Sequence, residues 1–139
     1  MSEPFELHPR LARGSTGIGR LRGCHLLLKD NALFPWLVLV PEVDAEIEDL
    51  HQLDPARFAE VTAAIREVSA FCSGYFQPTK LNVACIGNQV RQMHIHIVAR
   101  SEDDPAWPGT VWAHPGKQPY PPERAAEIVD AARTRLPLG

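Results

Sequence analysis

The chain has 139 residues, of which 45% are hydrophobic and 22% are charged, and these values indicate one soluble globular domain. At this length folding buries roughly 68% of the surface of the unfolded chain, enough for a hydrophobic core without disulfides or metals. The formal net charge of −3 and the lack of a basic stripe argue against a nucleic-acid polymer as the partner.

The cysteines and the apolar segments bear on the cellular compartment. Three cysteines, widely spaced and set among apolar residues, predict reduced thiols and not a disulfide framework. The first fifteen residues lack the apolar core of a signal peptide, and the apolar run 32–40 is too short to span a bilayer. We therefore expect a cytoplasmic protein with no membrane partner.

The first half of the chain begins with residues 1–20, which we interpret as an N-terminal extension. Cys24–Asp30 and Trp36–Glu42 are rich in β-formers and lie close together, which predicts two strands of an antiparallel hairpin. A helical pattern is expected over Asp44–Leu53, with Asp44 as its N-cap.

A long helix is predicted to begin after Asp54, because Asp54 can act as the N-cap and Pro55 suits the first helical position. Gly74 is a suitable residue to end this helix. Apolar residues recur at steps of three and four and predict one buried stripe, made of Phe58, Val61, Ile65, Val68 and Cys72.

The second half contains a further strand at Lys80–Asn88, a turn at Gly87-Asn88 and a following strand that ends at Arg100. A loop rich in Trp and Pro then covers residues 101–122, and a C-terminal helix is expected over 123–136. Hairpins and helices in this order predict a single domain over 1–139, of the α+β class with an antiparallel sheet.

Two histidines stand one residue apart in the stretch "NQVRQMHIHIVAR". In a strand, successive side chains point to opposite faces, so Gln92, His94 and His96 share one face and the apolar residues the other. Three interpretations follow: a solvated pair, a metal site, or catalysis by a nucleophilic imidazole beside a proton donor. A metal site needs a further ligand, and the candidates are His114, His51, Asp103 and Asp104.

Polar residues near the histidines favour a phosphate ligand. Asn82 and the turn Gly87-Asn88-Gln89 offer amide groups and backbone N–H groups that suit phosphate oxygens. Arg91 could add positive charge. We therefore treat these five residues as candidate substrate-binding groups.

The segment "NVACIGNQVRQMHIHIVAR" resembles the signature region of the histidine triad (HIT) superfamily of nucleotide hydrolases and transferases. The motif of that family is His-φ-His-φ-His-φ-φ, where φ is an apolar residue. The resemblance implies a HIT-like fold, in which a long helix and a C-terminal helix pack on an antiparallel sheet of about five strands. It also implies a nucleotide substrate, no cofactor and a homodimer.

The resemblance assigns a role to each matching residue. His94 would attack the α-phosphorus of a nucleoside phosphoramidate or dinucleoside polyphosphate and form a covalent nucleotidyl-histidine. His96 would assist departure of the leaving group. Asn88 and Gln89 would contact phosphate oxygens or the leaving group.

The chain departs from the family pattern at two positions. Gln92 replaces the first histidine of the triad, and Trp36 replaces a histidine near the start of the second strand. In the family the nucleophile donates from its second ring nitrogen to the backbone carbonyl of the first motif residue, and Gln92 keeps that carbonyl. We expect a slower enzyme, with two alternatives: a nucleotide-binding HIT-fold module with weak or no catalysis, or a metal-dependent hydrolase that uses His94 and His96 as ligands.

Overall fold

The computed structural model describes residues 4–139, which form an α+β fold around one five-stranded sheet of order β1-β2-β3-β5-β4. All neighbouring strands are antiparallel. This architecture confirms the predicted fold class. The strands are β1 (Ser15–Leu21), β2 (Cys24–Lys29), β3 (Trp36–Pro41), β4 (Lys80–Ala84) and β5 (Ile95–Arg100); the helices are α1 (Pro9–Arg13), α2 (Pro55–Phe76) and α3 (Pro122–Arg135), with single 3-10 turns η1 (Leu50–Gln52) and η2 (Val111–Ala113).

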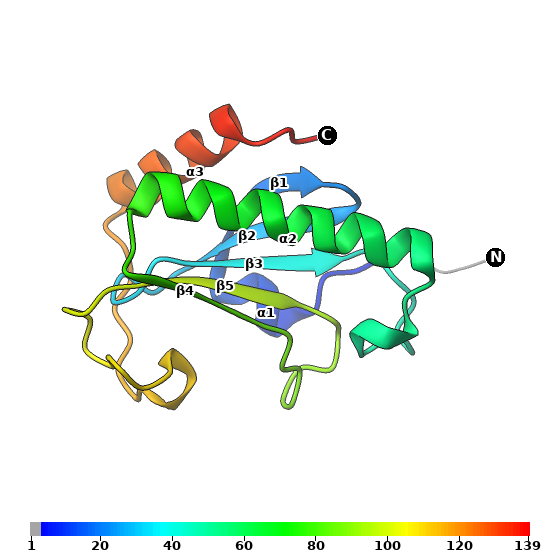
Figure 1. Ribbon diagram of the computed structural model, residues 1–139, viewed down its shortest axis with the longest axis horizontal. Helices are drawn as coiled ribbons and strands as arrows, with labels where there is room; N and C mark the ends of the chain where they lie inside the picture. The colour runs from blue at the N-terminus through cyan, green and yellow to red at the C-terminus, as the bar shows by residue number, and fades with distance from the viewer. Residues whose placement is uncertain (1–3) are drawn as a thin grey trace.

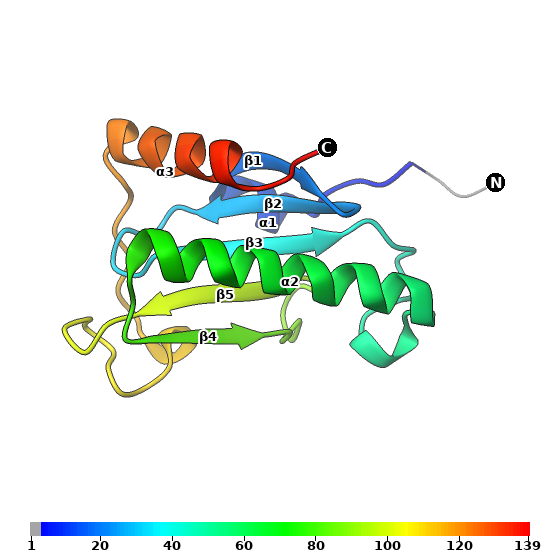
Figure 2. The ribbon, with the colours of Figure 1, turned by 45° about the horizontal axis from the view of Figure 1, so that its top comes forward.

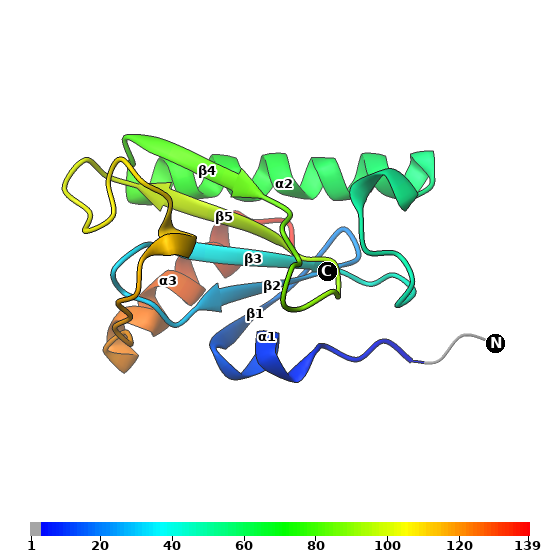
Figure 3. The same cartoon turned by 90° about the horizontal axis from the view of Figure 1, so that it is seen from below.

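The sheet has a different cover on each face. Helices α2 and α3 lie side by side across one face (Figures 1 and 2), and the larger hydrophobic core lies beneath them. On the other face a smaller apolar cluster packs under α1, the residues before it and the segment around η2 (Figure 3). The two predicted histidines lie on this second face, as described below.

Helix α2 forms where the pattern predicts it. The Asp54 side chain accepts a hydrogen bond of 2.7 Å from the Arg57 backbone N–H, which caps the helix. Two details of the prediction are wrong. The helix runs through Gly74 and ends at Phe76, because Gln77 takes the left-handed conformation that closes it (φ 51°). Phe58 is 42% exposed and so does not belong to the buried stripe.

The N-terminal part of the chain is more regular than the sequence suggested. Residues 15–21 are not an extension but form the edge strand β1, which pairs with β2. Gly17 and Gly19 hid this strand, because glycine is depleted in strands, and a register shift between them marks a bulge. The helix expected over Asp44–Leu53 is also wrong. Only η1 forms there, and its cap is Asp49, not Asp44.

The connection between β4 and β5 differs from the tight turn expected at Gly87-Asn88. Strand β4 ends at Ala84 and β5 begins at Ile95, so ten residues lie between them. Gly87 still has a positive φ of 68°, which favours glycine, but it lies inside a longer loop. The side chains of this loop are therefore free to differ in direction from those of a regular hairpin.

The C-terminal part agrees with the expectation. Residues 101–121 are irregular apart from η2, and α3 buries Ile128, Val129 and Ala132 against the sheet. No helix within residues 4–139 is both long enough and apolar enough to cross a membrane.

Candidate active site

Strand β5 and the two residues before it separate the core from the site. Met93, Ile95 and Ile97 pack in the core beneath the helices. His94 and His96 lie on the opposite face, with their ring centroids 4.8 Å apart. Both are buried, at 6% and 8% exposure. The predicted division of this segment into an apolar face and an imidazole face is confirmed.

The ring of His94 is held by the backbone of its neighbour. Its Nδ1 lies 2.7 Å from the carbonyl oxygen of Gln92. A carbonyl can only accept, so Nδ1 carries the proton and donates, and Nε2 keeps a free lone pair. Burial lowers the pKa of His94 below 6.5, although the hydrogen bond to Gln92 acts in the opposite direction. At neutral pH this ring is uncharged, with its lone pair on Nε2.

The ring of His96 is held in the opposite tautomer. The indole Nε1–H of Trp36 donates to His96 Nδ1 over 3.0 Å. Because an indole nitrogen can only donate, Nδ1 must be the unprotonated nitrogen and Nε2 carries the proton. Burial is the main cause that lowers the pKa of His96 to about 3; the neighbouring His94, when it is protonated, and the charge of Lys29 act in the same direction. His96 therefore offers a neutral N–H donor beside the lone pair of His94.

Two tryptophans enclose His96. Trp36 lies 5.6 Å from it between ring centroids, and Trp112 of η2 lies 5.4 Å from it, both edge to face. The two indoles also contact each other at 5.7 Å. The Trp- and Pro-rich segment therefore reaches the imidazole pair and reduces the access of water to it.

Gln92 takes part in the site through its backbone, while its side chain holds the N-terminal segment. Its Oε1 accepts from the His8 backbone N–H at 2.8 Å, and its Nε2 donates to the Glu6 carbonyl at 2.9 Å. The side-chain amide therefore satisfies one donor and one acceptor of the main chain at the same time. The Gln92 side chain thus forms a clamp on residues 6–8.

Asn82 lies on the same face of the sheet but is bound by Arg100. The Arg100 Nη1 donates to Asn82 Oδ1 at 2.9 Å, and its other nitrogens bind Asp104 at 2.8 and 3.0 Å. Arg100 is 2% exposed, so this network is buried. Burial acts to raise the pKa of Asp104, but the hydrogen bonds from Arg100, Ser101 and Ala106 outweigh it and lower the pKa to about 2.

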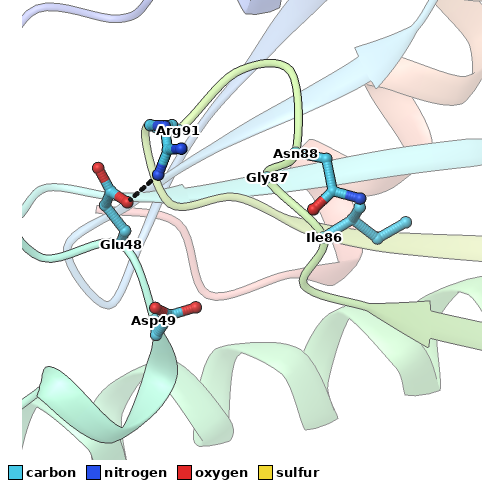
Figure 4. A pocket seen from close by; sticks show the side chains of 6 residues that line it. All are labelled: Glu48, Asp49, Ile86, Gly87, Asn88 and Arg91. Atoms are coloured by element: carbon cyan, nitrogen blue, oxygen red, sulfur yellow. Dashed lines mark hydrogen bonds and ion pairs between the residues drawn. The ribbon is translucent and has the colours of Figure 1, made fainter.

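The other predicted binding residues lie on the β4–β5 loop and point to different partners. Gly87 and Asn88 border a hollow of about 190 Å³ together with Glu48, Asp49 and Ile86 (Figure 4). Arg91 is turned across that hollow to Glu48 at 3.0 Å and is 75% exposed.

Gln89 lies on the same loop and accepts from Arg10 at 3.3 Å. The structure thus gathers His94, His96 and the Gln92 carbonyl, and it gives Asn82, Gln89 and Arg91 partners within the protein.

The ligand set needed for a metal site is not assembled in the described part of the chain. Within residues 4–139, no group of three or more His, Cys, Asp and Glu side chains could hold an ion. Of the candidates for a third ligand, Asp104 pairs with Arg100, and His114 accepts from the Gly116 backbone. His94 and His96 each have their Nδ1 engaged in a hydrogen bond, which leaves one nitrogen per ring.

The structure adds two contributors to the site that the sequence pattern does not predict. The side chain of Trp36 lies in the site, and its N–H donates to His96. Lys29, at the end of β2, lies 4.9 Å above the Trp36 ring and close enough to lower the pKa of both histidines. Strand alternation would have indicated Lys29, because residues 27 and 29 of β2 share a face of the sheet. Leu27 pairs with Val38, and Val38 pairs with His96, so this is the face that carries the histidines.

Comparisons with known proteins agree with this geometry. The sequence profile of the HIT domain matches residues 13–103. Among solved structures, histidine triad proteins from three bacteria superpose over almost the whole chain. That from Sinorhizobium meliloti is 36% identical, with a TM-score of 0.90, and 95% of this chain and 97% of that chain are covered.

The other two structures are equally similar. The protein from Bradyrhizobium japonicum is 32% identical, with a TM-score of 0.91 and coverage of 94% and 97%. That from Marinobacter aquaeolei is 34% identical, with a TM-score of 0.90 and coverage of 95% and 96%. No curated protein gives a significant match. The profile match and these structures show that the chain belongs to the HIT domain family.

Proposed function

We propose that the protein is a nucleotide hydrolase or nucleotidyl transferase that acts at the α-phosphorus of a nucleoside phosphoramidate or dinucleoside polyphosphate. One observation carries the proposal: two adjacent imidazoles are held in opposite tautomers. His94 has a free lone pair on Nε2, and His96 has a proton on Nε2. Nucleophile and donor are thus oriented before any substrate binds.

The reaction proceeds as two displacements. The lone pair of His94 Nε2 attacks phosphorus, a P–N bond forms, and the bond to the leaving group breaks with its electron pair on the leaving group. A polyphosphate leaves as an anion that accepts a hydrogen bond from His96, whereas the amine of a phosphoramidate leaves with the Nε2 proton of His96. Water then attacks phosphorus, the P–N electrons return to His94, and a nucleoside monophosphate is released. The proton that the water loses returns to His96 after an amine has left and is released to solvent after a polyphosphate has left. Because neutral imidazole is not repelled by phosphate oxygens, the lowered pKa of His94 favours this step.

The test is detection of the covalent intermediate. Intact-mass spectrometry after brief mixing with an adenosine phosphoramidate or diadenosine polyphosphate should show one added nucleotidyl group on His94. His94→Asn should lose the adduct and at least about a thousandfold in kcat, while the exposed His51→Asn serves as the control. Full activity of folded His94→Asn would eliminate this residue as the nucleophile.

A nucleotide-binding protein with slow or no turnover is the second candidate. The observation that favours it is the Gln92 side chain, which is occupied by Glu6 and His8 and therefore cannot extend a relay behind His94. Nucleotide binding that leaves no adduct on His94 would select this candidate.

We also propose a homodimer in the cytoplasm. Strand β4 is an edge of the sheet, and exposed apolar residues lie on it and just after it: Val83 at 46% and Ile86 at 39%. Three free thiols suit a reducing compartment. Light scattering after size-exclusion chromatography measures the mass directly, and a single-chain mass at micromolar concentration would contradict the dimer.

A further inference from the structure

Trp36 is surrounded by hydrogen-bond donors that lack acceptors. The ammonium of Lys29 lies 4.9 Å above its ring, and no carboxylate of residues 4–139 lies within 4.0 Å of that ammonium. The indole N–H of Trp112 is buried and has no hydrogen-bond acceptor among the same residues. His96 adds its Nε2–H, since its other nitrogen is bonded to Trp36. Donors gathered in this way indicate an anionic ligand.

The charge of Lys29 is incompletely compensated. The side chain is half-buried, and burial lowers its pKa, as does the positive charge of Lys117. The face of Trp36 stabilises the ammonium by attraction to its π electrons but does not neutralise it. Lys117, from the segment between η2 and α3, repels the ammonium of Lys29, and a bound anion would offset that repulsion. An unpaired buried donor, such as the Trp112 N–H, also costs stability until an acceptor arrives.

The position of Lys29 separates this anion from the reacting phosphorus. Val38 of β3 lies opposite His96 on β5 and opposite Leu27 on β2. Lys29 comes two residues after Leu27 and is therefore displaced along the strand direction from the position of His96. Two strand spacings, or about 10 Å, also separate the backbones of β2 and β5. A phosphate held at His94 Nε2 therefore leaves room at Lys29 for another anionic group of the same ligand.

We propose that Lys29 and the indole N–H of Trp112 form a second anion subsite, which binds a phosphate other than the α-phosphate. The substrate is then a nucleotide with at least two phosphate groups. This inference rests on the proposed function, because the first phosphate is assigned to the imidazole pair. The second phosphate belongs either to the leaving group or to the ribose.

Equilibrium binding tests the subsite without requiring turnover. Calorimetry with adenosine 5′-monophosphate, adenosine 5′-diphosphate and adenosine 3′,5′-bisphosphate should show that the wild type prefers a ligand with two phosphates. Preference for the diphosphate identifies the phosphate chain of the leaving group, and preference for the bisphosphate identifies a ribose phosphate. Equal affinity for all three ligands would overturn the proposal.

Substitutions then assign the preference to residues. Lys29→Met keeps the length of the side chain but removes its charge, and it should weaken the two-phosphate ligand about tenfold or more while the monophosphate changes less than about threefold. Lys29→Arg should keep the preference. Trp112→Phe keeps a ring against His96 but removes the N–H, and it should reduce the preference in part. Lys80→Met, an exposed lysine at the sheet edge, is the matched control.

The outcomes distinguish the two proposals. If the preference for a two-phosphate ligand depends on Lys29 but no adduct forms on His94, the subsite is supported and the proposed enzymatic activity is contradicted. If an adduct forms on His94 but Lys29→Met weakens the affinity for all three ligands equally, the enzymatic activity is supported and the subsite is contradicted. If Lys29→Met does not fold, Trp112→Phe and the salt dependence of the wild-type preference decide, because a charged subsite weakens as ionic strength rises.

Discussion

The proton of each imidazole is placed by a group that has only one hydrogen-bonding role. A backbone carbonyl can only accept, and it sets the His94 proton on Nδ1. An indole N–H can only donate, and it sets the His96 proton on Nε2. Neither contact depends on the side chain of residue 92. The glutamine at that position therefore leaves the tautomers of both rings intact.

Trp36→Phe tests the tautomer of His96. The variant keeps an aromatic ring against His96 but removes the N–H, so Nδ1 loses its donor and either tautomer becomes available. We expect kcat to fall about tenfold and the pKa of His96 to rise, because the lost bond stabilised the neutral ring. Nitrogen NMR shifts of the ring should change from one tautomer to a mixture.

The control for that experiment is Trp107→Phe, which alters an indole that packs on Arg100 and not on His96. A Trp36→Phe enzyme with unchanged ring-nitrogen shifts would contradict the assigned role. A change in stability alone would not produce the shift pattern, so the measurement separates positioning from packing.

Side-chain hydrogen bonds attach segments that are far apart in the chain to the two sides of the site. Gln92 holds Glu6 and His8 at one side, and the Arg100–Asp104 pair holds the start of the segment that carries Trp112 at the other. The long β4–β5 connection could not be located from its sequence, because Met93 continues the alternation of Ile95 and Ile97 and so extends the apparent strand.

Gln92→Ala tests the clamp on the N-terminal segment. It removes bonds of 2.8 and 2.9 Å to the main chain but keeps the carbonyl that orients His94. We expect amide exchange at His8 to accelerate about five- to thirtyfold, since two bonds are worth about 1–2 kcal/mol. The nucleotidyl adduct on His94 should still form.

Gln89→Ala is the matched control, because that side chain makes one longer contact, of 3.3 Å, to Arg10. Unchanged exchange at His8 in Gln92→Ala would show that the clamp does not hold the segment. Loss of the adduct in a folded protein would show that the side chain itself takes part in catalysis.

At the scale of the whole molecule, two neutral histidines make stability depend on pH. In the unfolded chain His96 binds a proton below about pH 6.5, whereas in the folded protein its pKa is about 3. Between these values the unfolded state binds more protons, so stability is complete above pH 6.5 and is lost as the pH falls. The loss is at most about 1.4 kcal/mol per pH unit from this residue.

Urea unfolding at pH 7 and pH 5 measures this effect. His96→Gln removes the titrating group and keeps an amide oxygen that can accept from Trp36. The wild type should lose about 1–2 kcal/mol more than the variant between the two pH values. Identical losses in the two proteins would contradict the low pKa of His96.

Those features that depend on residues close together in the chain could be predicted from the sequence alone. Alternation placed the two histidines on one face of a strand, and cap and stripe residues located α2, because such signals depend on neighbours within one or two turns. They failed at β1, where glycines weakened the pattern, and at Asp44–Leu53, where acids and apolar residues mimic a helix although only the short turn η1 forms.

The partners of the site residues were decided by the tertiary structure. Trp36 meets His96 across 60 positions of the chain, Gln92 meets Glu6 across 86, and Asn82 meets Arg100 across 18. No periodicity encodes these pairs, because they arise from the strand order β2-β3-β5-β4 and from two loops folding over one face. Residue type and spacing thus predicted an imidazole pair, whereas only the folded sheet determined which nitrogen of each ring is free to react.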